Sequence, residues 1–186
     1  MIDLNFLNGF FTERLILRKT IVRDALTLYN NIFNDYTYYK YYSPFYIDSF
    51  KTYQYIIDAV DNQNLVNNLI SLTVCLKSTF EPIGIITIHT IDYQNKTCGL
   101  GYIISKRYSN YGYTTEAVKK TIEYILNFLN IHRIEAQIIS TNIASIKVAQ
   151  KCNFKYESTK KESCFLDGQF FNQEVYVIFN NKNHDN

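Results

Sequence analysis

The apolar residues of this chain change several times between a two-residue and a 3.6-residue spacing, and the order of these changes limits the folds it can adopt. Alternating or continuously apolar runs predict strands at residues 13–18, 69–76, 83–91, 98–105, 133–139, 154–164 and 173–179. Helical spacing predicts helices at residues 25–31, 48–60, 114–129 and 143–151. This order predicts an α/β (α+β) fold with a mixed, mostly antiparallel central sheet.

Capping and turn residues set the limits of these segments. Asp24 and Asp48 stand where N-caps of the first two helices are expected, and Asp167-Gly168 predicts the turn of a closing hairpin. The tyrosine-rich stretch 36–44 is expected to be a loop or a broken helix. Because no linker or repeat interrupts the pattern, we expect a single domain over residues 1–186.

Composition and charge exclude several classes of function. Lys and Arg number 19 against 17 Asp and Glu, a net charge of +2 without a basic stripe, so we expect no nucleic-acid partner. No apolar stretch reaches bilayer length and the first eleven residues lack the basic start of a signal peptide, so we expect no membrane association. The four cysteines lack a C-x-x-C spacing, which predicts reduced thiols in a cytoplasm and no metal site.

The stretch from Lys106 to Ala117 joins a predicted strand to the longest predicted helix. The start of a helix offers unpaired N–H groups and a positive dipole end, which together suit a pyrophosphate. Gly112 would let the backbone approach the phosphates closely, and Arg107 could add a charged contact. The spacing alone favours an ordinary strand–helix turn with a glycine, and the glycines of a P-loop or a dinucleotide fingerprint are missing.

This stretch resembles the acetyl-CoA motif Q/R-x-x-G-x-G/A of the GNAT superfamily of N-acetyltransferases. Arg107 takes the first position and Gly112 the last, whereas Asn110 replaces the first glycine. The run from Gly112 to Ala117, G-Y-T-T-E-A, is similar to the helix start of the branch that acetylates protein N-termini, such as ribosomal-protein alanine or serine residues. The resemblance implies that acetyl-CoA is the co-substrate and that the following residues contact it: Arg107, Asn110, Tyr111, Gly112, Tyr113 and Thr114.

A second stretch, from Asn142 to Phe154, resembles the same branch's N-x-x-S-x-x-V-x-x-K-x-G-F. The resemblance implies that Asn142 contacts the pantetheine arm of the cofactor with Ser145 nearby, although a helix N-cap is the simpler interpretation of Asn142 alone. Asn153 stands in place of the glycine, where a left-handed helix end is expected.

The opening T-E-R-L-I-L-R at residues 12–18 and the ending around residues 166–176 also resemble this branch, so the likeness spans nearly the whole chain. It implies helices on both faces of the sheet and a gap between two splayed strands, the family's fourth and fifth, here 100–105 and 133–139. The pantetheine arm would lie in this gap. A backbone N–H near Ile103 or Ile104 would then stabilise the tetrahedral oxyanion.

The family transfers the acetyl group directly to an amine in a ternary complex. Glu157 is the candidate general base by its position after the second motif, and a solvent-facing glutamate is an equal alternative. Gly99 stands where relatives often carry a glutamate, which removes another possible base. Ser145 or a tyrosine could protonate the leaving thiolate, whereas His132 is expected to be a surface loop residue.

The acceptor remains open between three readings. The resemblance favours a protein or peptide N-terminal amine, and the alternatives are a small amine such as a polyamine or an antibiotic, or a module that binds acetyl-CoA without turnover. The tyrosine-rich segment 36–46 would shape the acceptor site or simply be partly buried. A monomer and a homodimer are both compatible with the sequence.

Overall fold

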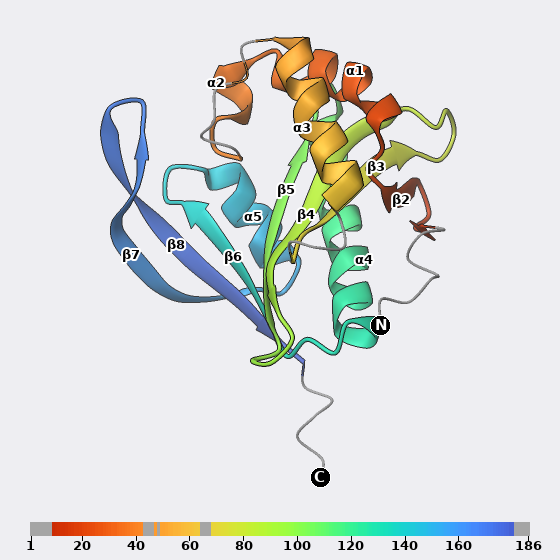
Figure 1. Cartoon of the computed structure of the whole chain (residues 1–186). Coiled ribbons are helices and arrows are strands. Elements are labelled where there is room, and N and C mark those ends of the chain that lie inside the picture. Colours follow the sequence, from red (N-terminus) through yellow and green to blue (C-terminus); the bar gives the residue numbers. More distant parts are fainter. Residues whose placement is uncertain (1–8, 43–46, 48, 64–67, 181–186) are drawn as a thin grey trace.

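A computed structural model describes residues 9–42, 47, 49–63 and 68–180, and they form one eight-stranded sheet in the order β1-β2-β3-β4-β5-β6-β8-β7 (Figure 1). The strands are β1 (Phe10–Phe11), β2 (Leu15–Lys19), β3 (Ile70–Leu76), β4 (Pro82–Asp92), β5 (Thr97–Ile104), β6 (Arg133–Ile139), β7 (Lys155–Leu166) and β8 (Gln169–Phe179). The helices are α1 (Ala25–Leu28), α2 (Tyr36–Tyr39), α3 (Phe50–Gln63), α4 (Tyr113–Phe128) and α5 (Ile143–Lys151), with short helical turns at Val22–Asp24, Tyr29–Phe33 and Lys106–Tyr108.

The sheet is antiparallel at every pairing except that of β5 with β6, which confirms the predicted mixed, mostly antiparallel fold. These two parallel strands pair only at their first residues, from Thr97↔Arg133 to Gly99↔Glu135. Beyond that point they diverge, as Figure 1 shows. The expected gap between strands 100–105 and 133–139 is therefore present.

Two apolar clusters cover the two faces of the sheet, as expected. One packs α4 and α5 against the β-strands and includes Ala117, Ile125, Ile134 and Ala149. The other packs α1, α2 and α3 on the opposite face, where Ile85 and Ile103 lie beside Tyr39, Tyr53 and Ile57. Because successive strand residues point to opposite faces, Ile85, Thr87 and His89 of β4, which lie between its two register shifts, face the α1–α3 side together with the odd-numbered residues of β5.

The local differences from prediction have physical causes. The helix expected at 25–31 is α1 followed by a wider turn at Tyr29–Phe33, and α2 forms within the stretch expected to be a loop or a broken helix. Asp24 does not cap α1 with its side chain, because its carboxylate accepts hydrogen bonds from Arg18, Thr73 and the Ile21 N–H. Asp48 lies outside the described residues, and the two-residue strand β1 was too short to predict.

The β7–β8 hairpin projects beyond the sheet, and its turn reaches α2 (Figure 1). Asp167 in this turn accepts hydrogen bonds from the Tyr36 hydroxyl at 3.0 Å and the Lys40 Nζ at 2.7 Å. These contacts connect the two sides of the molecule across the open end of the gap.

Candidate active site at the divided sheet

The edge of β5 that faces the gap has backbone groups without a neighbouring strand. The Ser105 N–H donates to the Ile83 carbonyl, and hydrogen bonds to one neighbour recur at every second residue of an antiparallel strand. The Ile103 N–H therefore points to β4, opposite Ile85, whereas the Ile104 N–H points into the gap. Of the two predicted oxyanion donors, Ile104 is the one whose N–H lies in the gap, and its carbonyl accepts a hydrogen bond from the Tyr38 hydroxyl. The oxyanion role itself stays a prediction.

The loop between β5 and α4 has the backbone shape that phosphate binding needs. Asn110 and Gly112 both adopt left-handed conformations, with φ of 68° and 81°, so Asn110 takes the angle expected of the glycine that it replaces. Gly112 is the N-cap of α4, whose first N–H groups have no partner within the helix. Tyr113 and Thr114 open the helix, and Tyr111 stacks on Tyr113 at 5.9 Å.

Arg107 is exposed in the short turn before this loop, with its guanidinium 5.4 Å from the Tyr108 ring. A second arginine, which the sequence analysis did not select, lies beside the same loop. Arg14 donates to the Tyr111 carbonyl at 3.0 Å, forms an ion pair with Glu116 at 2.6 Å and lies over the Tyr113 ring. The T-E-R-L motif marked Arg14 as a family feature, but nothing in its spacing indicated this contact.

A shallow pocket of about 430 Å³ opens next to the start of α4. Its lining residues are Glu13, Gly112, Thr115, Glu116, Lys119 and Lys151. Partial burial opposes ionisation of Glu116, yet hydrogen bonds from Thr12 and Arg14 lower its pKa, so the carboxylate is committed to structure. With Glu116 paired to Arg14, the remaining charged residues of the lining are Lys119, Lys151 and Glu13, whose summed charge (two positive, one negative) favours an anionic group.

Asn142 and Ser145 lie together at the start of α5. The Asn142 side chain is the N-cap and accepts a hydrogen bond from the Ser145 N–H at 3.2 Å. Across the gap, the Tyr102 hydroxyl of β5 donates to the Ser145 carbonyl at 2.9 Å. The structure therefore brings Ser145 next to one particular tyrosine, which the sequence could not distinguish from the other sixteen.

Glu157 lies at a register shift of β7, where its carboxylate accepts two hydrogen bonds from Arg133, both at 2.6 Å. These bonds lower the pKa of Glu157, which makes it a weak proton acceptor. Arg133 also pairs with Glu135 at 2.8 Å. The predicted role of Glu157 as general base stays a prediction, and this ion pair weighs against it.

The tyrosine-rich segment supplies one wall of the α1–α3 face. Tyr42 lies against Gly101 of β5 and its hydroxyl contacts the Thr87 hydroxyl at 3.4 Å, while burial raises the pKa of Tyr42 to about 12. Tyr39 is fully buried and its hydroxyl accepts a hydrogen bond from the Ile47 N–H. The expected partial burial of these tyrosines is therefore confirmed, and their role in shaping the acceptor site stays a prediction. Residues 43–46 lie outside the described part of the chain.

Comparison with known proteins decides what this divided sheet is. Residues 14–155 match the family described as the acetyltransferase (GNAT) domain. The chain belongs to this family. As a GNAT acetyltransferase it transfers an acetyl group from acetyl-CoA to an amine. The acetyltransferase is 29% identical over 169 residues to the uncharacterized N-acetyltransferase p20 of Bacillus licheniformis, covering 90% of this chain and 93% of that relative.

Solved structures confirm the fold of the acetyltransferase. The ribosomal-protein-S5-alanine acetyltransferase from Vibrio fischeri superposes with a TM-score of 0.82 at 22% identity, covering 94% of this chain and 97% of that chain. The spermidine N-acetyltransferase from Vibrio cholerae, in complex with CoA and spermine, gives 0.80 at 18% identity over 91% and 97%. At 22% and 18% identity, these two similarities show a shared fold and do not show a shared acceptor.

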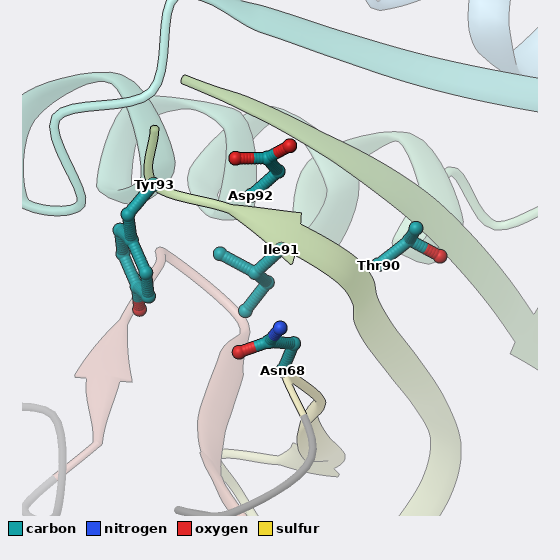
Figure 2. A pocket seen from close by; sticks show the side chains of 5 residues that line it. All are labelled: Asn68, Thr90, Ile91, Asp92 and Tyr93. Carbon is teal, nitrogen blue, oxygen red and sulfur yellow. The ribbon is translucent and has the colours of Figure 1, made fainter. Parts of the chain in front are cut away.

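A second pocket lies near the end of β4. It has a volume of about 330 Å³ and lies where β4 turns toward β5, lined by Asn68, Thr90, Ile91, Asp92 and Tyr93 (Figure 2). The Asp92 carboxylate already accepts hydrogen bonds from the backbone and side chain of Asn95. In the part of the chain that the structure describes, no group of three His, Cys, Asp or Glu could hold a metal ion, and no helix is long and apolar enough to cross a membrane.

Proposed function

We propose that this acetyltransferase acetylates the α-amino group of a protein or peptide N-terminus. The observation that carries the proposal is the charge balance on the α1–α3 face of the gap. There Glu135 and Glu157 share Arg133, and Glu135 also lies 3.7 Å from the Lys160 Nζ. The two carboxylates are thus neutralised by two cations, Arg133 and Lys160. A site without excess negative charge suits an acceptor that brings a single amine.

A polyamine carries several positive charges and needs carboxylates that are not already neutralised. The acidic residues near the acceptor segment do not supply such a cluster. Asp35 accepts a hydrogen bond from the Thr37 hydroxyl, which lowers its pKa, and Asp167 binds Lys40. Asp58 is exposed on α3, while Asp48 and the side chain of Asp61 lie outside the described residues.

The relatives contain both acceptor classes. One similar structure is named a ribosomal-protein-S5-alanine acetyltransferase and another a spermidine N-acetyltransferase, at comparable TM-scores. Because likeness of fold does not select an acceptor, the choice rests on the charges of this chain.

We assign the phosphates of acetyl-CoA to the loop and helix start formed by Arg107, Asn110, Tyr111, Gly112, Tyr113 and Thr114. The left-handed angles at Asn110 and Gly112 support this assignment because they turn successive N–H groups toward one side. The pantetheine arm would follow the free edge of β5 beside Ile103 and Ile104, with Asn142 and Ser145 on the other wall.

Acetyl-CoA supplies an activated acyl thioester, and the side chains of the gap position it. The N–H groups of Ile104 and Tyr102 point into the gap, and the one nearer the thioester would donate to the oxyanion. Ser145 or its neighbour Tyr102 would donate a proton to the departing sulfur. Holding the amine and the thioester together in this gap supplies much of the rate.

The test is an acceptor panel read by mass spectrometry. The protein and acetyl-CoA are incubated with peptides of varied N-terminal residues, the same peptides with blocked N-termini, several polyamines and common aminoglycosides. Acetylation confined to peptides with a free α-amine supports the proposal. Acetylation of polyamines or aminoglycosides with no peptide product contradicts it.

We further propose that residues 1–186 act as one domain in the cytoplasm. The continuous eight-stranded sheet supports a single unit, and the cysteines Cys75, Cys98, Cys152 and Cys164 are free thiols. Three of these four are buried, and burial raises the pKa of Cys75 and Cys152 to about 11, so they are unreactive. Monomer and homodimer remain equally compatible with the proposed reaction.

A further inference from the structure

A histidine covers the glycine at the point where the sheet divides. His89 of β4 lies directly opposite Gly99 of β5. A Cβ atom at Gly99 would stand only 2.2 Å from His89 Cε1 and 2.6 Å from Nδ1, so the imidazole ring occupies the space where a side chain of residue 99 would lie. His89 and a side chain at position 99 are therefore alternative occupants of one place.

This place lies at the closed end of the gap. Gly99↔Glu135 is the last pair between β5 and β6, and His89↔Gly99 is the adjoining pair between β4 and β5. Residues paired in this way share a face of the sheet, so His89 and Glu135 both face the α1–α3 side. His89 lies there in line with Thr87, which contacts Tyr42.

The reactive end of a bound acetyl-CoA must approach this closed end. Its phosphates are assigned to the loop after Ile104, and the gap narrows from Ile104 toward Gly99. Five steps along a strand at about 3.3 Å each span about 16 Å, so an extended arm held by the loop runs toward the vertex. An amine entering from the α1–α3 face would meet the thioester beside His89.

The surroundings of His89 keep its ring neutral. Partial burial lowers the pKa of His89, and the charge of Glu135 opposes this effect only in part. Partial burial also disfavours ionisation of Glu135, but hydrogen bonds from Arg133 and Gln137 and the charge of Lys160 lower its pKa. The residues of β4, β5 and β6 that face the His89 ring include one charged group, among those the structure describes, that acts on its pKa. This group is Glu135, whose negative charge favours the protonated ring.

We propose that His89 is the general base of the acetyl transfer, accepting a proton from the acceptor ammonium at the closed end of the gap. The inference rests on the proposed function. His89 Nδ1 lies 3.1 Å from the Thr90 hydroxyl. In the tautomer with the proton on Nδ1, Nε2 presents a lone pair to the substrate.

Proton transfer to His89 precedes the attack on the thioester. The ammonium gives one proton to Nε2, and the resulting amine attacks the thioester carbonyl to form a C–N bond. The C–S bond then breaks, and the departing thiolate takes a proton from Ser145 or Tyr102. The second amine proton restores that hydroxyl, and the products are the amide and CoA thiol. His89 releases its proton to water, which restores the neutral ring.

The experiment compares His89→Gln with His132→Gln, a matched control because His132 lies in the loop before β6 and packs on Phe179. The pH dependence of kcat/KM is measured with whichever amine the acceptor panel identifies. We expect His89→Gln to lower kcat/KM by about 100-fold. The acid limb of the profile should move up from the pKa of the His89 ring to that of the acceptor amine itself, about 7.7–8.0. His132→Gln should keep the wild-type profile. If only polyamines are acetylated, the proposal of a peptide acceptor is wrong. The comparison of His89→Gln with His132→Gln then still tests the general base, with a polyamine as the substrate.

A second pair of variants and a spectroscopic readout distinguish chemistry from structure. His89→Ala should be as slow as His89→Gln, and adding Gly99→Glu to it should restore at least about tenfold, since the new carboxylate enters the vacated space. In NMR titrations the His89 ring, assigned with His89→Gln, should shift when acetyl-CoA binds. An unchanged acid limb in His89→Gln, or a His89 resonance that ignores acetyl-CoA, would overturn the proposal.

Discussion

Replacing Gly112 by alanine tests whether the loop before α4 binds the phosphates of acetyl-CoA. Gly112 has a φ of 81° and its added Cβ would lie 3.5 Å from Arg14 Nη2, an ordinary contact. Gly168 provides a matched control, because its φ is 78° and a Cβ there meets nothing within 4 Å. Both substitutions thus impose the same backbone strain, but only one lies beside the proposed phosphate site.

An alanine held at a left-handed backbone angle costs about 1–2 kcal/mol of folding free energy. Alanine also reduces the conformational entropy of the unfolded chain, which offsets about 0.4–1 kcal/mol of this cost. A net loss near 1 kcal/mol should lower the midpoint of thermal unfolding by about 2–4 °C in a chain of this size, equally for both variants. At Gly112 the methyl group also blocks one charge-assisted hydrogen bond, which is worth about 1.5–3 kcal/mol. The dissociation constant of acetyl-CoA should therefore rise by about 10- to 100-fold in Gly112→Ala alone.

Isothermal titration calorimetry measures this affinity, and thermal unfolding without cofactor measures the strain. The assignment of the phosphates to this loop is supported if both variants lower the unfolding midpoint equally and only Gly112→Ala weakens the binding of acetyl-CoA. If Gly112→Ala binds acetyl-CoA within about threefold of the wild type while both variants lose stability equally, the phosphates lie elsewhere and the reasoning fails.

Three further outcomes follow from the ion pairs. Glu157→Gln should change kcat/KM by less than about threefold, since Arg133 already makes this carboxylate a weak base, and a loss of about 100-fold would return Glu157 to the base role. Asp24→Asn should lower the unfolding midpoint by roughly 6–12 °C, because the carboxylate is only 2% exposed and binds Arg18 and Thr73, and breaking such a buried ion pair costs about 3 kcal/mol. The control is Asp58→Asn at an exposed position, which should shift the midpoint by less than about 2 °C. Arg133 lowers the pKa of Glu157 and Glu135 below their ordinary 4.5, so this stabilisation is present above pH 4.5 and is lost as the pH falls through the lowered values. Arg133→Gln should therefore flatten the fall of the unfolding midpoint below about pH 4.5, and an unchanged slope would show that the ion pairs do not contribute.

The catalytic assignments show where sequence reasoning reached its limit. The motifs selected Gly112, Asn110 and Asn142, and in the structure these residues have the conformations that their types suggest. Glu157 was chosen by its distance from a motif, but its partner Arg133 comes from another strand 24 residues earlier. His89 carried no motif, and its place above Gly99 follows from the antiparallel register of β4 and β5.

The sequence by itself determined the order of strands and helices, the mixed sheet and the loop before α4, because these depend on apolar spacing, capping residues and backbone preferences that act within a few positions. Only the tertiary structure decided which amide of β5 faces the gap, which tyrosine meets Ser145 and which group lies where β5 and β6 part. Those outcomes depend on register and on contacts between segments far apart in the chain, such as Arg14 with Tyr111. A shift of one residue in register would move each of these side chains to the other face of the sheet.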